Sequence, residues 1–539
     1  MYTFLDRVGD NDLRTFLQRI CSPEHYERIK SLGRNEIYSA LFSLYGFDIL
    51  YEKRIRRLLF LTLSKAELTE LAKELNLNHD RKVFDLALSI SNVPWRVRAS
   101  IIWRFAELFS VPIEYLPTRE RQNDSIEVIE PFVQPPSLFD YQEELSSEIL
   151  NLLCSGKNKA CLLQLPTGAG KTKTMMEAIT KYLNLNEGTD RPIGILWLAH
   201  TEELCEQAIE SFRRVWQAKG NFEIRMARFW GDYKVPLEQM SGGIIVGGYQ
   251  KAFNLFKNSP NEFKKLKDLL SIVIVDEAHK ALAPTIKSLL SAIRESNGVC
   301  LLGLTATPGR GKEARLENLR LAKMFDKKLI YAEQLGDNPI KELQQRGVLS
   351  QIRGISQNTN ISCSLSEEER KLAEFANDIP STVLNRLAHN ISRNEIILSI
   401  VLNQIQQGNP TLVFACTVQH AKELAVAVAM RGHKAAAIDC RMRRNLRRRT
   451  INAFRKSEID VLFNFGVLST GFDAPNIRTV VIARPTSSIV LYSQMIGRGL
   501  RGAVVGGTEE CILIDIKDNF ENFGDVDKVY SHFNCFWSS

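Results

Sequence analysis

Short apolar runs that alternate with helical stretches are the feature of this sequence that most restricts its fold. Five of these runs, between residues 161 and 306, read CLLQL, GILWLA, GIIVG, SIVIVD and CLLGLTA. Five more, between residues 411 and 515, read TLVFAC, AAAID, DVLFNF, TVVIA and CILID. Strands that are apolar on both faces and alternate with helices predict parallel sheets covered on both sides. We therefore predict an α/β fold with two such cores in tandem, separated by a charged helical stretch around residues 312–400.

The sequence before the first apolar run has a different pattern. Residues 1–118 carry apolar side chains three and four positions apart, which predicts an all-helical N-terminal domain. Residues 119–136 are rich in proline and charge and predict a linker. The first core is then predicted over residues 137–332 and the second over residues 333–539.

Composition excludes several classes of protein. No apolar run approaches the ~18 residues that a membrane span needs, and the first residues are acidic where a secretory leader would be basic and apolar. We therefore expect a cytoplasmic protein without a membrane partner. The cysteines contain no Cys-x-x-Cys pair, which argues against a zinc site. The net charge of +8 permits a polyanionic partner without requiring one.

The stretch LPTGAGKT, residues 165–172, has the context of a phosphate-binding loop because a predicted strand precedes it and a predicted helix follows it. Leu165 stands where the short consensus asks for glycine. Small residues let backbone N–H groups approach phosphates at the positive end of a helix. A glycine-rich turn with a solvated lysine is the alternative. The predicted nucleotide-binding residues here are Thr167, Gly168, Ala169, Gly170, Lys171 and Thr172.

A pair of carboxylates follows the apolar run SIVIV. Asp276 is placed to hold Mg²⁺ together with Thr172, and Glu277 is placed to polarise a water molecule in line with the terminal phosphate. The alternative is that both carboxylates are solvated loop residues. The phosphate-loop stretch about a hundred residues upstream argues against this alternative.

Together these stretches resemble the motifs of superfamily-2 helicases of the DEAD/DEAH-box type over most of residues 137–520. The resemblance extends to FDYQEEL, WLAHTEELCEQ and LTATPGR, and later to TLVFACTVQHA, FNFGVLSTGFDAPN and YSQMIGRGLRG. The family's own first motif lacks the early glycine, which accounts for Leu165. The resemblance implies two RecA-like cores, ATP and Mg²⁺ as cofactors, and a nucleic-acid-stimulated ATPase or helicase. It also implies that Gln142 reads adenine and that Gly471 and Asp473 contact the nucleotide.

The last motif, QMIGRGLR, supplies two arginines from the core opposite Lys171. Arg498 and Arg501 are three residues apart, so they are predicted to share one helix face and reach across a cleft to phosphate oxygens. An arginine in this place typically accelerates phosphoryl transfer by ~10³ to 10⁵. The resemblance assigns coupling between the cores to Thr305, Thr307 and Gln494.

The nucleic-acid contacts follow from the same resemblance, with one departure. The family usually has threonine where this chain has Gly248, so a hydroxyl contact is lost there. The run RMRRNLRRR, residues 441–449, contains six arginines and predicts phosphate contact, with a solvated helix start as the alternative. The predicted nucleic-acid-binding residues are His200, Thr201, Gly248, Gln250, Thr417, Arg443, Arg444, Arg447 and Thr470.

The amino-acid sequence of the later motifs resembles that of repair-type helicases and of the motor subunits of type I and type III restriction enzymes. This implies an ATP-dependent translocase or helicase on double-stranded DNA, nucleoid-associated, in repair, restriction or antiphage (antiviral) defence. Two alternatives remain open: an RNA helicase of the DEAH type, and an ATP-switched DNA clamp that recruits a nuclease without unwinding. The balanced charge of the N-terminal domain favours a protein partner or a regulatory role there over direct DNA contact.

Overall fold

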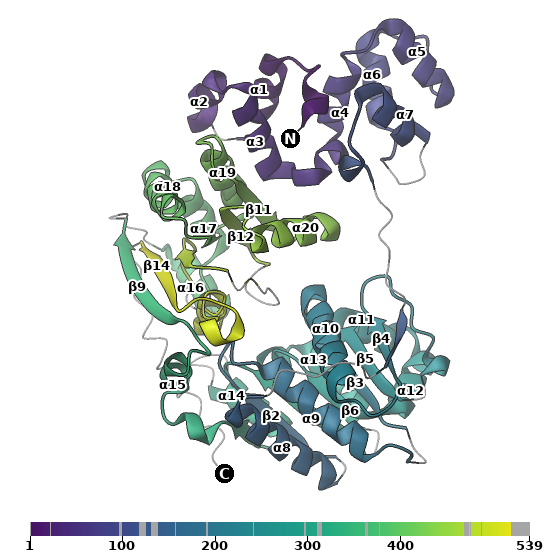
Figure 1. The fold of residues 1–539 in the computed structure, drawn as a ribbon, viewed down its shortest axis with the longest axis vertical. Coiled ribbons are helices and arrows are strands. Elements are labelled where there is room, and N and C mark those ends of the chain that lie inside the picture. The colour runs from purple at the N-terminus through teal and green to yellow at the C-terminus, as the bar shows by residue number, and fades with distance from the viewer. Residues whose placement is uncertain are drawn as a thin grey trace.

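The computed structural model describes the whole chain except residues 1, 22, 96–99, 118–124, 131–137, 157, 190–191, 241, 296–297, 310–314, 360, 362–364, 377, 468–473, 475, 487 and 519–539. The described residues form a helical region and two separate sheets with helices packed on their faces (Figure 1). None of the described helices combines the length and apolar character needed to cross a membrane.

The described residues before Pro117 form helices and no strand. Their apolar faces meet in one core, and Ser64 caps one of the helices through a reciprocal contact with Glu67. The helices are α1 (Asp10–Gln18), α2 (Tyr26–Ser31), α3 (Arg34–Tyr45), α4 (Lys53–Phe60), α5 (Lys65–Glu74), α6 (Val83–Ser91) and α7 (Ser100–Phe109).

The first sheet contains all five of the strands predicted for the first core, and its strands are parallel except for one edge strand. Three strands, β1, β4 and β8, were not predicted. In spatial order the strands are β1 (Ile126–Ile129), β4 (Ile224–Phe229), β5 (Gly243–Gly248), β3 (Gly194–Ala199), β6 (Leu270–Val275), β7 (Cys300–Thr305), β2 (Ala160–Gln164) and β8 (Leu329–Tyr331).

Helices cover both faces of this sheet. Neighbouring residues of one strand belong to opposite layers, as Leu163 and Leu162 do, because side chains alternate along a strand. The helices are α8 (Asp140–Cys154), α9 (Lys171–Leu185), α10 (Glu202–Lys219), α11 (Tyr249–Asn258), α12 (Pro260–Leu269), α13 (Pro284–Arg294) and α14 (Arg315–Met324).

Strand β1 lies inside the segment predicted as a linker and pairs antiparallel with β4 at the edge of the first sheet. Its Glu127 accepts hydrogen bonds from Arg213 (Nε, 2.8 Å) and from the buried Arg228 (Nη2, 2.8 Å). The strand carries only three apolar side chains, and its one carboxylate joins this charged cluster, which a search for apolar runs does not detect.

The second sheet is parallel throughout and contains the five strands predicted for the second core. A sixth, β9, lies in the stretch predicted as helical. It was missed because five of its eight residues are exposed at the sheet edge and its sequence is polar. In spatial order the strands are β11 (Ala435–Asp439), β12 (Val461–Phe465), β10 (Thr411–Phe414), β13 (Thr479–Ile482), β14 (Glu510–Lys517) and β9 (Gln351–Asn358).

One helix of the second core, α19, belongs to two hydrophobic cores at once. Leu424 and Ala425 pack on the second sheet, whereas Val426 and Met430 complete the core of the N-terminal helices. In Figure 1 the N-terminal helices accordingly sit directly over α19 and α20. The helices after the first sheet are α15 (Pro339–Gln345), α16 (Glu367–Ala376), α17 (Ser381–Ala388), α18 (Ile391–Gln406), α19 (Val418–Ala429), α20 (Arg444–Arg455) and α21 (Ile489–Ile496).

Candidate nucleotide site between the two cores

The predicted phosphate loop joins β2 to α9. Gly168 and Gly170 have φ angles of +88° and +86°, in the region that favours glycine. A Cβ atom on Gly170 would lie only 2.3 Å from Nε2 of Gln142. The loop therefore needs glycine at this position, and it leads directly into the positive end of α9.

Lys171, the first residue of α9, turns its ammonium group back into the loop. Its Nζ donates to the carbonyl oxygens of Leu165 (3.1 Å) and Pro166 (3.3 Å). Burial lowers the pKa of Lys171, whereas the nearby charges of Glu277 and Asp276 raise it. The lysine thus lies between the loop and the acidic pair.

Gln142 is buried against the same loop. Its Nε2 donates to the carbonyl oxygen of Ala169 (3.1 Å), and its Oε1 accepts from the backbone N–H of Phe139 (3.2 Å). The hydroxyl group of Tyr141 also donates to Ala169 O (3.0 Å). The structure therefore brings Gln142 to the phosphate loop, although sequence reasoning missed the support from Tyr141.

The acidic pair follows β6. Oδ1 of Asp276 accepts from the backbone N–H of Glu277 (2.9 Å), and Glu277 has a φ of +51°, which is unusual for a residue with a Cβ. Burial, and then the charge of Glu277, raise the pKa of Asp276 to about 7. Burial also raises the pKa of Glu277, but the positive charges of His279 and Lys171 outweigh it and the net pKa is lowered. Glu277 is thus the member of the pair that holds its negative charge more strongly.

His279 connects the acidic pair to the segment after β7. Its Nδ1 lies 3.4 Å from Oε2 of Glu277 and 3.3 Å from Oγ1 of Thr305. Oγ1 of Thr305 in turn donates to the carbonyl oxygen of Thr307 (2.8 Å) and accepts from its N–H (3.1 Å). Thr305 and Thr307, predicted as coupling residues, are therefore in hydrogen-bond contact with one another, and Thr305 also contacts His279.

Residues of the second core contact this site across the interface between the two cores, which we call the seam. Nε2 of Gln494 donates to Oε2 of Glu277 over 3.5 Å, a long hydrogen bond. A Cβ on Gly497 would lie 2.3 Å from Cγ2 of Thr167, so the end of α21 packs directly on the phosphate loop. The positive charge of Arg498 lowers the pKa values of both Lys171 and Glu277, which places its guanidinium within electrostatic reach of them.

The expectation that Arg498 and Arg501 share a helix face is wrong. Helix α21 ends at Ile496, and Arg501 forms an antiparallel β-bridge with Leu349. Glycines 497, 499 and 502 follow the helix, and a Cβ on them would lie 2.3, 2.3 and 2.0 Å from neighbouring atoms. The two arginines are therefore presented by a loop, in which Nε of Arg498 donates to the carbonyl oxygen of Gln494 (3.2 Å).

Several predicted nucleic-acid-binding residues lie at the carboxyl ends of parallel strands. Thr201 and Thr417 cap α10 and α19 by accepting the N–H groups of Leu204 (3.3 Å) and His420 (3.0 Å). Gly248 ends β5. The two hydroxyls therefore serve as helix caps in equivalent places of the two cores.

Two other candidates lie at the ends of β3 and β5. Nε2 of Gln250 donates to Oδ1 of Asn254 (3.0 Å) on the exposed side of α11. Although the residue as a whole is exposed, desolvation of the ring, and then the charge of Lys280, lower the pKa of His200. His200 is therefore a neutral imidazole at pH 7.

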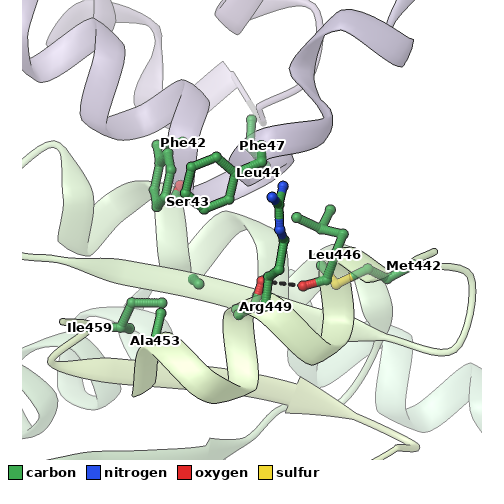
Figure 2. Close-up of a pocket in the computed structure, with 13 residues that line it drawn as sticks. Phe42, Ser43, Leu44, Phe47, Met442, Leu446, Arg449, Ala453 and Ile459 are labelled. Atoms are coloured by element: carbon green, nitrogen blue, oxygen red, sulfur yellow. Dashed lines mark hydrogen bonds between the residues drawn. The ribbon is translucent and has the colours of Figure 1, made fainter. Parts of the chain in front are cut away.

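The arginine run of residues 441–449 begins α20 and contacts the N-terminal helices. The guanidinium of Arg443 lies 3.2 Å from the ring centroid of Tyr51, and that of Arg449 lies 4.9 Å from the ring of Phe47. Nη1 of Arg449 also donates to the carbonyl oxygen of Glu114 (2.9 Å). Figure 2 shows Arg449 pointing from α20 toward Phe47.

The pocket drawn in Figure 2 lies at this junction between α20 and the N-terminal helices. Its volume of about 20 Å³ has room for one water molecule and not for a nucleotide. It is a packing gap at a domain junction and plays no part in the nucleotide site.

A third arginine of the run crosses between the two cores. Nη2 of Arg447 donates to Oε1 of Glu203 on α10, and both side chains are largely buried. In this arrangement Arg443 and Arg447 thus contact protein groups. The side chain of Arg444 lies outside the description, as do residues Thr470, Gly471 and Asp473, so those predictions have no structural counterpart here.

Comparisons with known proteins agree with this two-core site. Residues 136–310 match the family described as type III restriction enzyme, res subunit, and residues 392–503 match the helicase conserved C-terminal domain. IRC3 of Saccharomyces cerevisiae, a candidate ATP-dependent helicase by name, is 25% identical over 402 residues, which cover 72% of this chain and 53% of IRC3. The chain thus spans about half the length of that relative.

Two solved structures share the fold. The DEAD-box helicase Mss116 bound to single-stranded RNA and UDP-BeF has a TM-score of 0.51 at 17% identity, over 71% of this chain and 71% of Mss116. The ATP-dependent Type ISP restriction-modification enzyme LlaBIII bound to DNA has a TM-score of 0.50 at 15% identity, over 75% of this chain and 29% of LlaBIII. At these identities the likeness concerns the fold alone.

The fold and the seam define a nucleotide-dependent enzyme with two parallel-sheet cores. The matched families make the assignment specific: residues 136–310 and 392–503 contain domains of superfamily-2 helicases that are related to the motor subunits of restriction enzymes.

Proposed function

We propose that this chain is an ATP-dependent translocase or helicase that acts on double-stranded DNA in repair, restriction or antiphage defence. The observation that carries the proposal is the meeting of both cores at one seam, where Gln494 contacts Glu277 and the charge of Arg498 acts on Lys171. A reaction that needs groups from both cores ties nucleotide turnover to their relative movement.

The first core binds the phosphates. The φ angles of Gly168 and Gly170 and the positive end of α9 fit a phosphate ligand, since backbone N–H groups can approach it closely. Lys171 exchanges the carbonyl oxygens of Leu165 and Pro166 for phosphate oxygens. Thr172 and Asp276 would hold Mg²⁺, which neutralises phosphate charge when bound.

Glu277 orients the attacking water and accepts its proton as the bond to the terminal phosphate breaks. Its lowered pKa keeps it ionised at neutral pH for this task. Arg498 and Arg501 stabilise the charge that spreads over the transferred phosphoryl group. Because both arginines belong to the second core, the transition state forms only when the cores are closed.

The contacts of His279 with Glu277 and Thr305 offer a route from hydrolysis to the nucleic acid. Thr305 ends β7 and Thr307 follows it, at the same carboxyl ends of the strands as Thr201 and Gly248. We place the nucleic-acid backbone along these strand ends of both cores, where His200, Gln250 and Thr417 complete the contact. The family resemblance further assigns Thr470 to the nucleic acid and Gly471 and Asp473 to the nucleotide, and these three residues lie outside the described part of the chain.

The match of residues 136–310 to a restriction-enzyme subunit family supports duplex DNA as the substrate. The N-terminal helices support a second role, because they already dock on α19 and can present their exposed side to a protein partner such as a nuclease.

The decisive experiment is the ATPase rate of the purified full chain across duplex DNA, single-stranded DNA and RNA of matched sequence. We expect the largest stimulation by duplex DNA. Stimulation by RNA alone would replace the proposal with an RNA helicase. Stimulation by duplex DNA without displacement of a bound triplex strand would replace it with an ATP-switched clamp.

A further inference from the structure

The segment that connects the two cores touches both sides of the nucleotide seam. We call residues 347–350 the connector strand; they lie between α15 and β9. The backbone N–H of Ser350 donates to the carbonyl oxygen of Leu500 (3.0 Å), and that of Gly502 donates to Val348 O (3.0 Å). Together with the bridge between Leu349 and Arg501, these bonds make the connector strand a short partner of the arginine-bearing loop.

Ser350 is the most constrained residue of the connector strand. It is fully buried, and its Oγ lies 2.5 Å from the carbonyl oxygen of Arg501 and 2.7 Å from that of Thr508. The N–H of Thr508 donates to the same Arg501 oxygen (2.9 Å). The hydroxyl thus lies between the carbonyl groups of Arg501 and Thr508 and can donate its one proton to either, on the two sides of the turn that follows the arginines.

The surrounding backbone leaves no room for this turn to relax. A Cβ on Gly502 would lie 2.0 Å from the carbonyl oxygen of Gly347, and one on Gly507 would lie 2.1 Å from that of Arg501. Backbones packed this closely move together. A shift of the connector strand is therefore transmitted to the loop that carries Arg498 and Arg501.

The connector strand also contacts the phosphate loop. A Cβ on Gly168 would lie 3.0 Å from Cδ2 of Leu349, the residue that forms the bridge with Arg501. One short segment therefore touches the loop that binds phosphate and the loop that supplies the arginines.

We propose that Ser350 is a positioning residue for phosphoryl transfer, which holds the backbone of Arg501 and so directs Arg498 and Arg501 at the terminal phosphate of ATP. The proposal rests on the function proposed above, because it requires that these arginines act on the transferred group. Ser350 does not touch the nucleotide; it acts through the loop.

The test is Ser350→Ala in the full chain, with ATP turnover measured at saturating nucleic acid. The variant loses one buried hydrogen bond at the Arg501 carbonyl group. Because this group must be fixed to within a fraction of an ångström, we expect kcat to fall by roughly 10-fold or more. The KM for ATP and the affinity for ADP are expected to stay within about 3-fold of wild type, because the phosphate loop keeps its own contacts. Affinity for ADP with aluminium fluoride, a transition-state analogue, is expected to fall in parallel with kcat.

Thr411→Val is the matched control. Oγ1 of Thr411, also buried in the second core, donates to the carbonyl oxygen of Asn409 (2.8 Å) and lies away from the seam. Its loss removes a comparable bond and is expected to leave kcat unchanged. If Ser350→Ala does not fold, Ser350→Cys keeps a weaker donor of similar size and is expected to give an intermediate kcat.

Two results would overturn the inference. One is wild-type kcat in Ser350→Ala; the other is an equal fall in ADP affinity and analogue affinity, which marks a purely structural role. Arg498→Ala, measured in the same assay, separates the proposed role of the arginines from the proposed role of Ser350. If that variant keeps full analogue affinity, the proposed role of the arginines fails; if it loses affinity while Ser350→Ala does not, only the connector inference fails.

Discussion

Gly170 and Gln142 show how closely single residues are fitted in the phosphate loop. The glycine must adopt a positive φ and also leave room for the amide of Gln142. Gly188 shares only the first requirement. Gly188, beyond the end of α9, has a φ of +74°, and a Cβ added to it would meet no neighbouring atom within 4 Å.

We predict that Gly170→Ala and Gly188→Ala share the stability cost of a positive φ but differ in nucleotide binding. Each variant forces a Cβ into the left-handed region, which costs on the order of 1 kcal/mol. Only Gly170→Ala also collides with Gln142, so only this variant is expected to lose most of its affinity for a fluorescent ATP analogue. Equal affinity of the two variants would show that the fit against Gln142 is irrelevant to nucleotide binding.

His420 is a buried titratable residue whose partners fix its protonation state. Its Nδ1 accepts from the backbone N–H of Cys416 (3.2 Å), and its Nε2 lies 2.9 Å from Oδ1 of Asn394. Burial, and then the charge of Arg393, lower the pKa of His420 to about 3. A proton on Nδ1 would face the N–H group from which this atom now accepts, so the folded state keeps the neutral ring.

We predict that the second core loses stability as the pH falls below about 6.5, where histidine in the unfolded chain takes up a proton first. The linkage amounts to ~2 kcal/mol between pH 6.5 and pH 5, because only the unfolded state binds the proton over that range. Urea midpoints of the wild type at the two pH values measure it. In His420→Gln this part of the pH dependence is expected to disappear, and an unchanged dependence would rule out His420 as its source.

Among the elements, α20 is the one whose observed contacts differ most from its predicted role. Its arginines suggest a surface for nucleic-acid phosphates, yet Arg443 stacks on Tyr51 and Arg447 pairs with Glu203 of the other core. Phosphate oxygens would have to replace these partners. The run therefore joins the N-terminal helices and both cores in the arrangement seen here.

The ion pair between Arg447 and Glu203 gives two predictions, in which the change in DNA affinity has opposite signs for the two partners. If Arg447 can exchange Glu203 for phosphate, Arg447→Gln weakens DNA binding and reduces its salt slope by about 1. Glu203→Gln frees the arginine and is expected to strengthen binding. Titrations at low and moderate salt measure both, with Lys371→Gln, which removes an exposed charge outside the arginine run, as the control. A Glu203→Gln variant that binds no better than wild type would leave the pair a structural contact between the cores.

The sequence predicted elements well where a strand is apolar on both faces. All ten runs of this kind became strands, because burial on both sides leaves a continuous apolar pattern. Edge strands β1 and β9 escaped prediction, since β1 is held by Glu127 with Arg213 and β9 alternates between exposed and half-buried residues. The connector strand escaped as well, because its contacts depend on the meeting of the two cores and leave no local signature.

At the scale of the whole molecule, the N-terminal helices and the second core are packed as one unit. Val426 and Met430 of the second core lie inside the N-terminal hydrophobic core, and Nη2 of Arg28 donates to the carbonyl oxygen of Met430 (3.2 Å). The chain then returns through β1 to the edge of the first sheet. Movement between the cores should therefore carry the N-terminal helices with the second core.

The central claim is that groups from both cores are needed to hydrolyse ATP. Its most direct test is the single-turnover rate of ATP hydrolysis by Arg498→Ala with duplex DNA present, with ATP affinity measured in parallel and exposed Arg448→Ala as the control. We predict a rate at least ~10³-fold lower, with little change in ATP affinity, because the arginine acts mainly in the transition state. A wild-type rate in Arg498→Ala would contradict the account.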